Sequence, residues 1–286
     1  MDDTKLLHAW ALGGDGRYPW AVRSLRRSGL PVKTWQVPGM ENEAAGLVEA
    51  LSGADLVLLP REPFQGEMLE IAGETVEAAL LPRMLNAGAT VVAGSIPVEV
   101  EAWLQDQGLS CVSYLELESY QVVNGEITAE GALQYMLQQT TRTLRGARIL
   151  VIGWGRIGRF LSRKLRDLGA KVTVTARRPG QRAEIECLGM RSDETGSYRR
   201  GLSDYDVVVN TVPACVLSAA QGRSLKKDCL LLELASAPGG FAPELQGKRR
   251  ILMAPGLPGI TAPETAGESL AAAVWDCLAG EGRTLE

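Results

Sequence analysis

The chain has 286 residues, 45% hydrophobic and 22% charged, which is the composition of a globular protein long enough for two domains. Its 30 Lys and Arg residues against 34 Asp and Glu residues argue against a general nucleic-acid binder. No stretch approaches the roughly 20 apolar residues of a membrane span, and the first residues show no secretory signal. We therefore expect a cytoplasmic protein with neither membrane nor nucleic acid as a partner.

Two residue types limit the possible chemistry. The single histidine, His8, lies beside the N-terminus in an expected strand, so neither a multi-histidine metal site nor a Ser-His-Asp triad is expected. The five cysteines are odd in number and form no C-x-x-C pair, which predicts isolated reduced core thiols and no bound metal. They are Cys111, Cys187, Cys215, Cys229 and Cys277. The chemistry must then come from other side chains or from a cofactor.

Short apolar runs alternate with amphipathic stretches in the first 127 residues. Strands are predicted over 6–12, 32–36, 56–59, 90–93 and 110–114, and helices over 19–28, 42–51, 76–86 and 99–107. Apolar residues at helical spacing predict a long helix over 128–144. The alternation then resumes, with strands over 147–152, 171–175, 207–211, 229–233 and 251–253, a helix over 160–168, and a last helix over 265–278.

This rhythm predicts an α/β protein of two doubly wound, Rossmann-like domains with parallel sheets and a cleft between them. We expect a substrate-binding and catalytic domain (1–127), a crossover helix (128–145), a nucleotide-binding domain (146–262) and a C-terminal helix (263–286). Residues 128–144 and 265–278 both carry apolar or small-residue faces that must be buried. We expect both helices to pack on the first domain, an arrangement that favours a hinge.

A G-x-G-x-x-G motif lies between the first strand and the first helix of the second domain. In such a motif Gly153 permits the tight turn, Gly155 lets the backbone approach a pyrophosphate, and Gly158 lets the helix pack close to the strand. The N–H groups of the helix N-terminus then bind the phosphates. The predicted contacts are Gly153, Trp154, Gly155, Arg156, Ile157 and Gly158.

The next strand indicates which dinucleotide binds. An NAD site usually has Asp or Glu about 20 residues after the glycine motif, to bind the ribose 2′-hydroxyl. Here the strand ends in Thr175-Ala176-Arg177-Arg178, with no acid. Arg177 and Arg178, with the hydroxyl of Thr175, suit a 2′-phosphate, so we predict NADP. Further contacts are expected where the strand over 207–211 ends, at Thr211, Val212 and Pro213.

Five segments, in order along the chain, resemble the family of the A-type subunit of dipicolinate synthase. They are Gly14-Asp15-x-Arg17, Thr128-Ala129-Glu130-Gly131-Ala132, Gly153-x-Gly155-Arg156-x-Gly158, Leu234-Ala235-Ser236-x-Pro238-Gly239-Gly240, and Pro255-Gly256-Leu257-Pro258-Gly259-x-x-Ala262-Pro263-x-Thr265-Ala266-Gly267. The resemblance implies an NADP-dependent oxidoreductase of spore formation. Its reaction would be oxidation of a dihydrodipicolinate-type intermediate of lysine biosynthesis to pyridine-2,6-dicarboxylate, with the flavoprotein-like B-type subunit of dipicolinate synthase as partner. Before Thr128 the family's Asn-Ala-x-Pro pattern is replaced by Asn124-Gly125-Glu126-Ile127.

A substrate with two carboxylates needs cations and aligned N–H donors. The predicted substrate contacts are Gly14, Arg17, Thr128, Ser236 and Gly256, and the predicted proton acceptors are Asp15 and Glu130. Alternative roles stay open at three of these positions. Asp15 could form a turn or orient Arg17 by a salt bridge, Glu130 could cap a helix beginning at Thr128, and Arg17 could be a surface arginine. For Arg17 as anchor, Arg17→Lys should raise the substrate KM without changing NADP affinity.

Two other functions are compatible with the sequence. The first is another two-domain NAD(P)-dependent dehydrogenase of a small carboxylic acid, against which the near absence of histidine argues. The second is a regulatory subunit that binds NADP without turnover. The sequence leaves open whether the chain forms a homo-oligomer.

Overall fold

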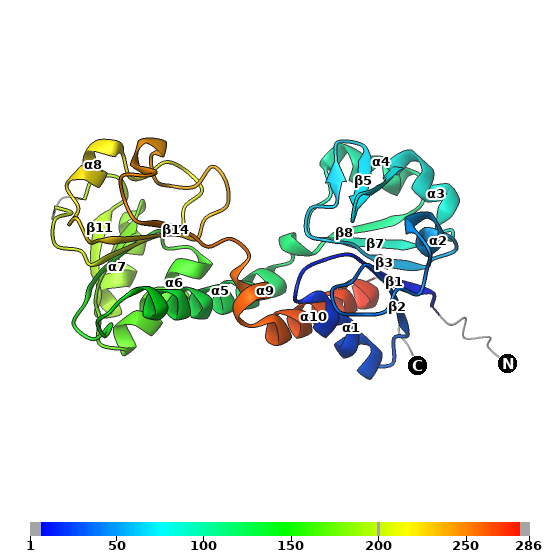
Figure 1. Ribbon diagram of the computed structural model, residues 1–286, viewed down its shortest axis with the longest axis horizontal. Helices are drawn as coiled ribbons and strands as arrows, with labels where there is room; N and C mark the ends of the chain where they lie inside the picture. Colours follow the sequence, from blue (N-terminus) through cyan, green and yellow to red (C-terminus); the bar gives the residue numbers. More distant parts are fainter. Residues whose placement is uncertain (1–6, 199–200, 281–286) are drawn as a thin grey trace. The chain divides into compact units, whose positions relative to one another are not determined.

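The computed structural model describes residues 7–198 and 201–280 (Figure 1). The chain divides into two compact units, the first formed by residues 1–124 and 258–286 and the second by residues 125–257. Each unit contains a parallel sheet, of five strands in the first and six in the second. The predicted α/β class with two Rossmann-like sheets is therefore confirmed.

The sheet of the first unit has the strand order β2-β1-β3-β7-β8, with every pair parallel. The strands are β1 (Ala9–Leu12), β2 (Val32–Trp35), β3 (Leu56–Leu58), β7 (Thr90–Ala93) and β8 (Ser110–Ser113). The helices are α1 (Tyr18–Arg27), α2 (Leu47–Leu51), α3 (Leu81–Met84), α4 (Val98–Asp106) and α10 (Pro263–Gly280). β2 and β3 lie on opposite sides of β1, so the strand order reverses at β1. Parallel sheets bind ligands at the carboxyl ends of the strands beside such a reversal, which here are β1 and β3.

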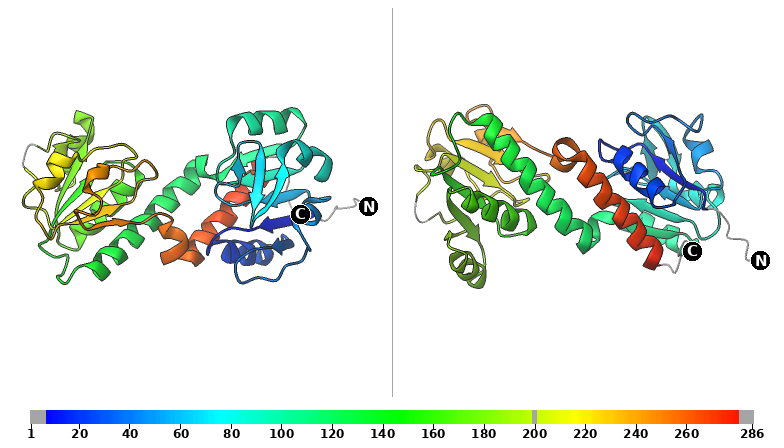
Figure 2. Two further views of the ribbon diagram at one scale, coloured as in Figure 1. Left: turned by 45° about the horizontal axis from the view of Figure 1, so that its top comes forward. Right: turned by 90° about the horizontal axis from the view of Figure 1, so that it is seen from below.

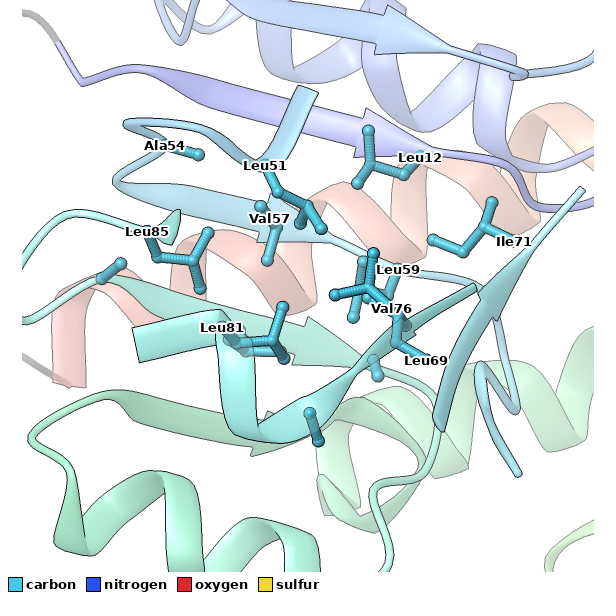
Figure 3. Packing of buried hydrophobic residues seen from close by; sticks show 14 of the residues in the cluster. Leu12, Leu51, Ala54, Val57, Leu59, Leu69, Ile71, Val76, Leu81 and Leu85 are labelled. Atoms are coloured by element: carbon cyan, nitrogen blue, oxygen red, sulfur yellow. The ribbon is translucent and has the colours of Figure 1, made fainter. Parts of the chain in front are cut away.

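Successive strand residues pack on opposite faces of this sheet. Leu12 and Val57 face a core closed by α2, α3 and α4 (Figure 3). Ala11 and Leu58 face the other core, which is closed by α1 and α10. The helices α1 and α10 lie side by side (Figure 2). A β-carbon at Gly267 would overlap the α1 backbone, so a glycine is required for this close approach.

An antiparallel hairpin sheet in the first unit replaces part of an expected helix. It has the order β4-β5-β6, from β4 (Phe64–Gln65), β5 (Met68–Ile71) and β6 (Glu74–Glu77). The prediction of a helix over 76–86 was wrong for residues 76–77, which end β6, and only Leu81–Met84 are α-helical. Ala72 and Gly73 both have positive φ in a two-residue turn, the geometry that joins two strands. Figure 3 shows Leu69 and Val76 of this hairpin beside Leu59.

Two other helices differ from their predicted ranges. Only Leu47–Leu51 of the expected 42–51 is helical, because the Glu43 carboxylate accepts the backbone N–H of Thr34 at 2.8 Å and holds that segment beside β2. Helix α5 (Glu118–Gln139) begins ten residues before the expected start at Thr128. Gly125 lies within α5, and a β-carbon there would lie 3.1 Å from the β-carbon of Arg156, so the glycine lets α5 and α6 pack closely.

The second unit has the sheet order β11-β10-β9-β12-β13-β14, all parallel. The strands are β9 (Arg148–Ile152), β10 (Lys171–Ala176), β11 (Arg191–Glu194), β12 (Val207–Asn210), β13 (Leu230–Glu233) and β14 (Ile251–Met253). The helices are α6 (Arg156–Asp167), α7 (Pro179–Cys187) and α8 (Ala219–Arg223). The unit ends at the first residue of α9 (Leu257–Thr261), whose other residues belong to the first unit. If the strands are numbered along the chain with β9 as strand 1, their order in the sheet is 3-2-1-4-5-6. This is the arrangement of dinucleotide-binding sheets, which bind their ligand between strands 1 and 4, here β9 and β12. The polar β11 was not predicted.

The crossover helix packs differently from its prediction. Ala129, Ala132 and Met136 of α5 are buried in the core of the second unit, so the expectation that residues 128–144 pack on the first domain was wrong. The helix α10 belongs to the first unit, where Leu270 and Val274 are buried.

Among the helices that the structure describes, none has the length and apolar character needed to cross a bilayer.

Candidate functional site

The glycine motif forms the loop between β9 and α6, and its three glycines have different surroundings. Gly153 has a φ of 110°, and a β-carbon there would overlap the hydroxyl of Thr211. A β-carbon at Gly158 would overlap the carbonyl of Gly153. At Gly155, the residue that precedes α6, no atom lies within 4 Å of an added β-carbon. The first and third glycines thus let the backbone pack tightly, whereas the second leaves open space at a helix N-terminus, which suits a phosphate.

A buried polar pair braces the strand ends beside this loop. Asn210, at the end of β12, donates from Nδ2 to Glu233 Oε1 at 2.6 Å and to the Val212 carbonyl at 2.8 Å. Glu233, at the end of β13, also accepts the backbone N–H groups of Ala235 and Gly240. Both side chains are 2% exposed or less. This pair was not predicted from the sequence, although an amide and a carboxylate at the ends of two adjacent apolar strands are a detectable signal.

The end of β10 presents two exposed arginines, Arg177 and Arg178. Arg182 of α7 donates from Nη1 to the carbonyl of Arg177 at 2.9 Å and to that of Ala176 at 3.1 Å, which fixes the turn. Thr175 is fully buried and accepts a hydrogen bond from Thr195 at 3.0 Å. The two arginines are therefore placed to bind an anion, and the Thr175 hydroxyl is not.

The other predicted cofactor contacts lie around the loop between β9 and α6, and their side chains differ in how exposed they are. The indole of Trp154 is 4% exposed and donates to Glu184 Oε2 at 2.8 Å, so this side chain stabilises the packing of α7. Arg156 is exposed in the first turn of α6, and Ile157 packs on the core. Past the end of β12, Thr211 donates to the Ile152 carbonyl at 2.8 Å; Val212 is half-buried and Pro213 exposed.

In the first unit, Arg17 is buried and held within the chain. Its Nε donates to Asp15 Oδ1 at 2.9 Å and its Nη1 to the Tyr120 hydroxyl at 2.7 Å. The side chain is 4% exposed, whereas that of Asp15 is 46% exposed. Burial opposes the charge of Arg17, but Tyr120 and the Asp15 carboxylate outweigh it and raise the pKa of Arg17 above its usual value. Asp15 thus pairs with Arg17, the alternative that the sequence left open.

Three tyrosines extend this cluster. The Tyr18 hydroxyl donates its hydrogen to the Leu59 carbonyl at 2.7 Å. In the 3.2 Å contact between the hydroxyls of Tyr18 and Tyr114, the donor is therefore Tyr114. The rings of Tyr114 and Tyr120 meet edge to face, 4.9 Å apart. Burial raises the pKa of Tyr18 and of Tyr114 well above the usual value, so both remain protonated donors at neutral pH.

The remaining predicted site residues lie on different elements. Glu130 is exposed in the middle of α5 and pairs with Lys164 at 2.8 Å, so it does not cap a helix beginning at Thr128. Thr128 is buried, and Ser236 is exposed in the loop after β13. Gly256, with a φ of 68°, precedes α9. Asp15 belongs to the first unit and Glu130 to the second.

The sequence predicts no bound metal and five buried, reduced cysteines. In residues 7–198 and 201–280, no group of three or more His, Cys, Asp or Glu side chains could hold a metal ion. None of the five cysteines, all of which lie within the described residues, forms a disulfide bond. The prediction that they are core thiols was wrong for Cys187 and Cys215, which are exposed.

Comparisons with known proteins agree with this architecture. The family "D-isomer specific 2-hydroxyacid dehydrogenase, NAD binding domain" matches residues 115–228. The crystal structure of a transhydrogenase from Sinorhizobium meliloti is similar in fold, with a TM-score of 0.70 at 17% identity over 96% of this chain and 95% of that one. Fold and glycine loop together define a dehydrogenase-like protein with an NAD(P)-binding domain.

Two relatives are similar to this chain over nearly its whole length. The A-type subunit of dipicolinate synthase from Bacillus subtilis (strain 168) is 29% identical over 272 residues, 91% of this chain and 92% of the relative. The crystal structure of the corresponding dipicolinate synthase subunit from Bacillus halodurans matches with a TM-score of 0.82 at 27% identity, over 96% of this chain and 98% of that one. The resemblance of this chain to A-type subunits of dipicolinate synthase therefore extends over nearly its whole length, and the resemblance stated from the sequence motifs is confirmed.

Proposed function

We propose that this protein is an NADP-dependent oxidoreductase that forms dipicolinate from a dihydrodipicolinate-type intermediate. The observation that carries the proposal is a likeness to the A-type subunit of dipicolinate synthase that covers 91% of the chain and so spans both units. In the reaction, the dihydropyridine ring loses one hydride and one proton and becomes aromatic. If the precursor is hydroxylated, one water leaves as well.

The loop between β9 and α6 fits the phosphates of a dinucleotide, because Gly155 has open space beside it and precedes the N–H groups of α6. Bound there, NADP supplies the hydride acceptor. Arg177 and Arg178 support NADP over NAD, since a 2′-phosphate gains charge-assisted hydrogen bonds from exposed guanidinium groups. The buried Asn210–Glu233 pair keeps the neighbouring loops in place.

Of the two carboxylates predicted to accept the proton, Asp15 has the better support. It lines a pocket at the carboxyl ends of β1 and β3 and is half-exposed. Glu130 instead lies on the surface of α5, paired with Lys164. Gly14 lines the same pocket as Asp15, and contacts from Thr128, Ser236 and Gly256 remain part of the proposal.

The family match to 2-hydroxyacid dehydrogenases favours one competing function, the oxidation of a small hydroxy acid. Such enzymes usually rely on a histidine as acid or base. His8, the single histidine of the sequence, precedes the amino end of β1, and parallel sheets bind ligands at the carboxyl end. The dipicolinate-forming reaction is therefore the better supported proposal.

The relatives are named as one subunit of a synthase, so we include the flavoprotein-like B-type subunit among the proposed partners. The test mixes the purified chain with NADP and dihydrodipicolinate, with and without a candidate B-type subunit. We expect NADPH and dipicolinate absorbance to rise together. NADP binding without turnover under both conditions would instead support a regulatory role, and oxidation of a 2-hydroxy acid would support the competing dehydrogenase.

A further inference from the structure

A pocket of about 410 Å³ lies at the carboxyl ends of β1 and β3 in the first unit. This is the crevice where a sheet with this strand order binds ligands, and the volume is that of a small-molecule site. The loop after β1, the loop after β3 and the turn between β5 and β6 form its wall. Its lining includes Gly14, Asp15, Tyr18, Arg61, Glu62 and Glu70.

The arginine that the sequence favoured as a carboxylate anchor is not the exposed cation of this pocket. Arg17 is 4% exposed, and its Nε and Nη1 are bound to Asp15 and Tyr120. A ligand carboxylate would have to displace one of these buried contacts. Arg61, in contrast, lines the pocket with a side chain that is 45% exposed.

The backbone that carries Arg61 is held rigidly. Three successive carbonyls each accept a hydrogen bond: that of Leu59 from the Tyr18 hydroxyl at 2.7 Å, and those of Pro60 and Arg61 from the N–H groups of Gly94 and Ser95 at 3.2 and 2.8 Å. A β-carbon at Gly94 would overlap the backbone of Arg61, so the two loops are in close contact. A rigid backbone lowers the entropy lost when a side chain binds a ligand.

The ion pair that Arg61 makes within the chain is weak. Its Nε lies 3.3 Å from Glu62 Oε1, and both side chains are exposed, at 45% and 69%. Exposed pairs of this kind contribute about 0–1 kcal/mol. A ligand carboxylate can replace this single contact with a bidentate one, because the guanidinium group presents two parallel N–H donors to the two carboxylate oxygens.

We propose that Arg61 binds one carboxylate of the substrate in this pocket, an inference that rests on the proposed function. The pocket takes one carboxylate and not two, because Arg61 is the one cation among the described residues of its lining, and Asp15, Glu62 and Glu70 also line it and would repel a second carboxylate. The ligand class is therefore a planar pyridine or dihydropyridine carboxylate that presents a single carboxylate to Arg61.

The test measures the binding of pyridine-2-carboxylate and pyridine-2,6-dicarboxylate to the full chain by calorimetry, without nucleotide. We expect Arg61→Gln to weaken both ligands by the same factor, at least tenfold, and Arg61→Lys to weaken them less. NADP affinity should not change. Arg83→Ala is the matched control, since Arg83 is an exposed arginine of the first unit outside the pocket lining, and it should bind both ligands like the unmodified protein. Glu62→Gln should bind as tightly or more tightly, because the internal competitor is removed.

Turnover of dihydrodipicolinate separates failure of this inference from failure of the proposed function. If the unmodified protein turns over and Arg61→Gln has the same KM and ligand affinities, Arg61 is not the anchor and the function stands. If the protein does not turn over but binds both carboxylates through Arg61, the anchor stands and the reaction is wrong. Binding of neither carboxylate by the unmodified protein would overturn the anchor, as would an equal loss in Glu62→Gln and Arg61→Gln.

Discussion

Asn210 Nδ2 donates to Glu233 Oε1 at 2.6 Å, joining the carboxyl ends of β12 and β13 inside the second unit. Asn210→Ala removes this donor, so the buried Glu233 carboxylate keeps only the backbone N–H groups of Ala235 and Gly240 as donors. We expect the free energy of unfolding of the second unit to fall by about 1–3 kcal/mol, measured by urea denaturation. Glu244→Gln, at an exposed glutamate of the same unit, is the control. Equal stability of the two variants would show that the pair contributes nothing.

The glycine loop offers a matched pair of substitutions. Gly158→Ala places a β-carbon against the Gly153 carbonyl, so we expect stability to fall by about 1–3 kcal/mol even without ligand. Gly155→Ala meets no neighbouring atom and should change stability by less than about 1 kcal/mol, while weakening dinucleotide binding at least tenfold. Thermal unfolding and calorimetry test both. Unchanged dinucleotide affinity in Gly155→Ala would argue against phosphate binding at this loop.

Cofactor preference depends on Arg177 and Arg178. We expect NADP to bind more tightly than NAD, and replacement of both arginines by alanine to weaken NADP alone. Each charge-assisted contact is worth about 1.5–3 kcal/mol, or roughly tenfold to a hundredfold in affinity. Arg191→Ala is the control, because Arg191 lies at the amino end of β11, whereas Arg177 and Arg178 follow the carboxyl end of β10. Equal calorimetric affinities of the unmodified protein for NADP and NAD would refute the preference.

The buried contacts of Arg17 change what its substitution should do. Arg17→Lys was expected to raise the substrate KM, but the structure ties Arg17 to Asp15 and Tyr120. We now expect both Arg17→Lys and Tyr120→Phe to lower the free energy of unfolding by about 1–3 kcal/mol, with Tyr135→Phe as a control. A raised KM for Arg17→Lys with unchanged stability would restore Arg17 as a substrate anchor.

Thiol labelling tests the burial of the cysteines. Burial raises the pKa of Cys229 to about 12, so this thiol is protonated and unreactive at neutral pH. Cys187 and Cys215 are exposed. We expect two fast-reacting thiols in the folded protein and none in a Cys187→Ser, Cys215→Ser variant. Labelling of Cys229 as fast as Cys215 would contradict the packing around β13.

Strong local patterns predicted most of the fold. The strands Thr90–Ala93 and Ile251–Met253 have the predicted bounds, because each is a short apolar run between turn residues. The β4–β6 hairpin and β11 were missed, since their strands carry many polar residues and depend on tertiary packing. The start of α5 was missed because the prediction rested on apolar residues at helical spacing from Thr128 onward, and the close approach of Gly125 to Arg156 is visible only in three dimensions.

The candidate site was predictable where the backbone itself is the functional group. The glycine spacing predicts separate roles for Gly153, Gly155 and Gly158; Gly153 and Gly158 are closely packed, and Gly155 has open space beside it. Side-chain contacts were less predictable. The burial of Thr175 and the pairing of Arg17 with Tyr120 depend on residues 20 and 103 positions away. Sequence spacing carries no information about such contacts.

The most direct test of the proposed function is the stoichiometry of a single reaction. The protein, supplied with a candidate B-type subunit, is mixed with NADP and dihydrodipicolinate, and NADPH and dipicolinate are quantified over time. We expect one NADPH for each dipicolinate formed, and loss of both products in Gly155→Ala. Dipicolinate formed without NADPH, or at an unchanged rate in Gly155→Ala, would contradict the proposed function.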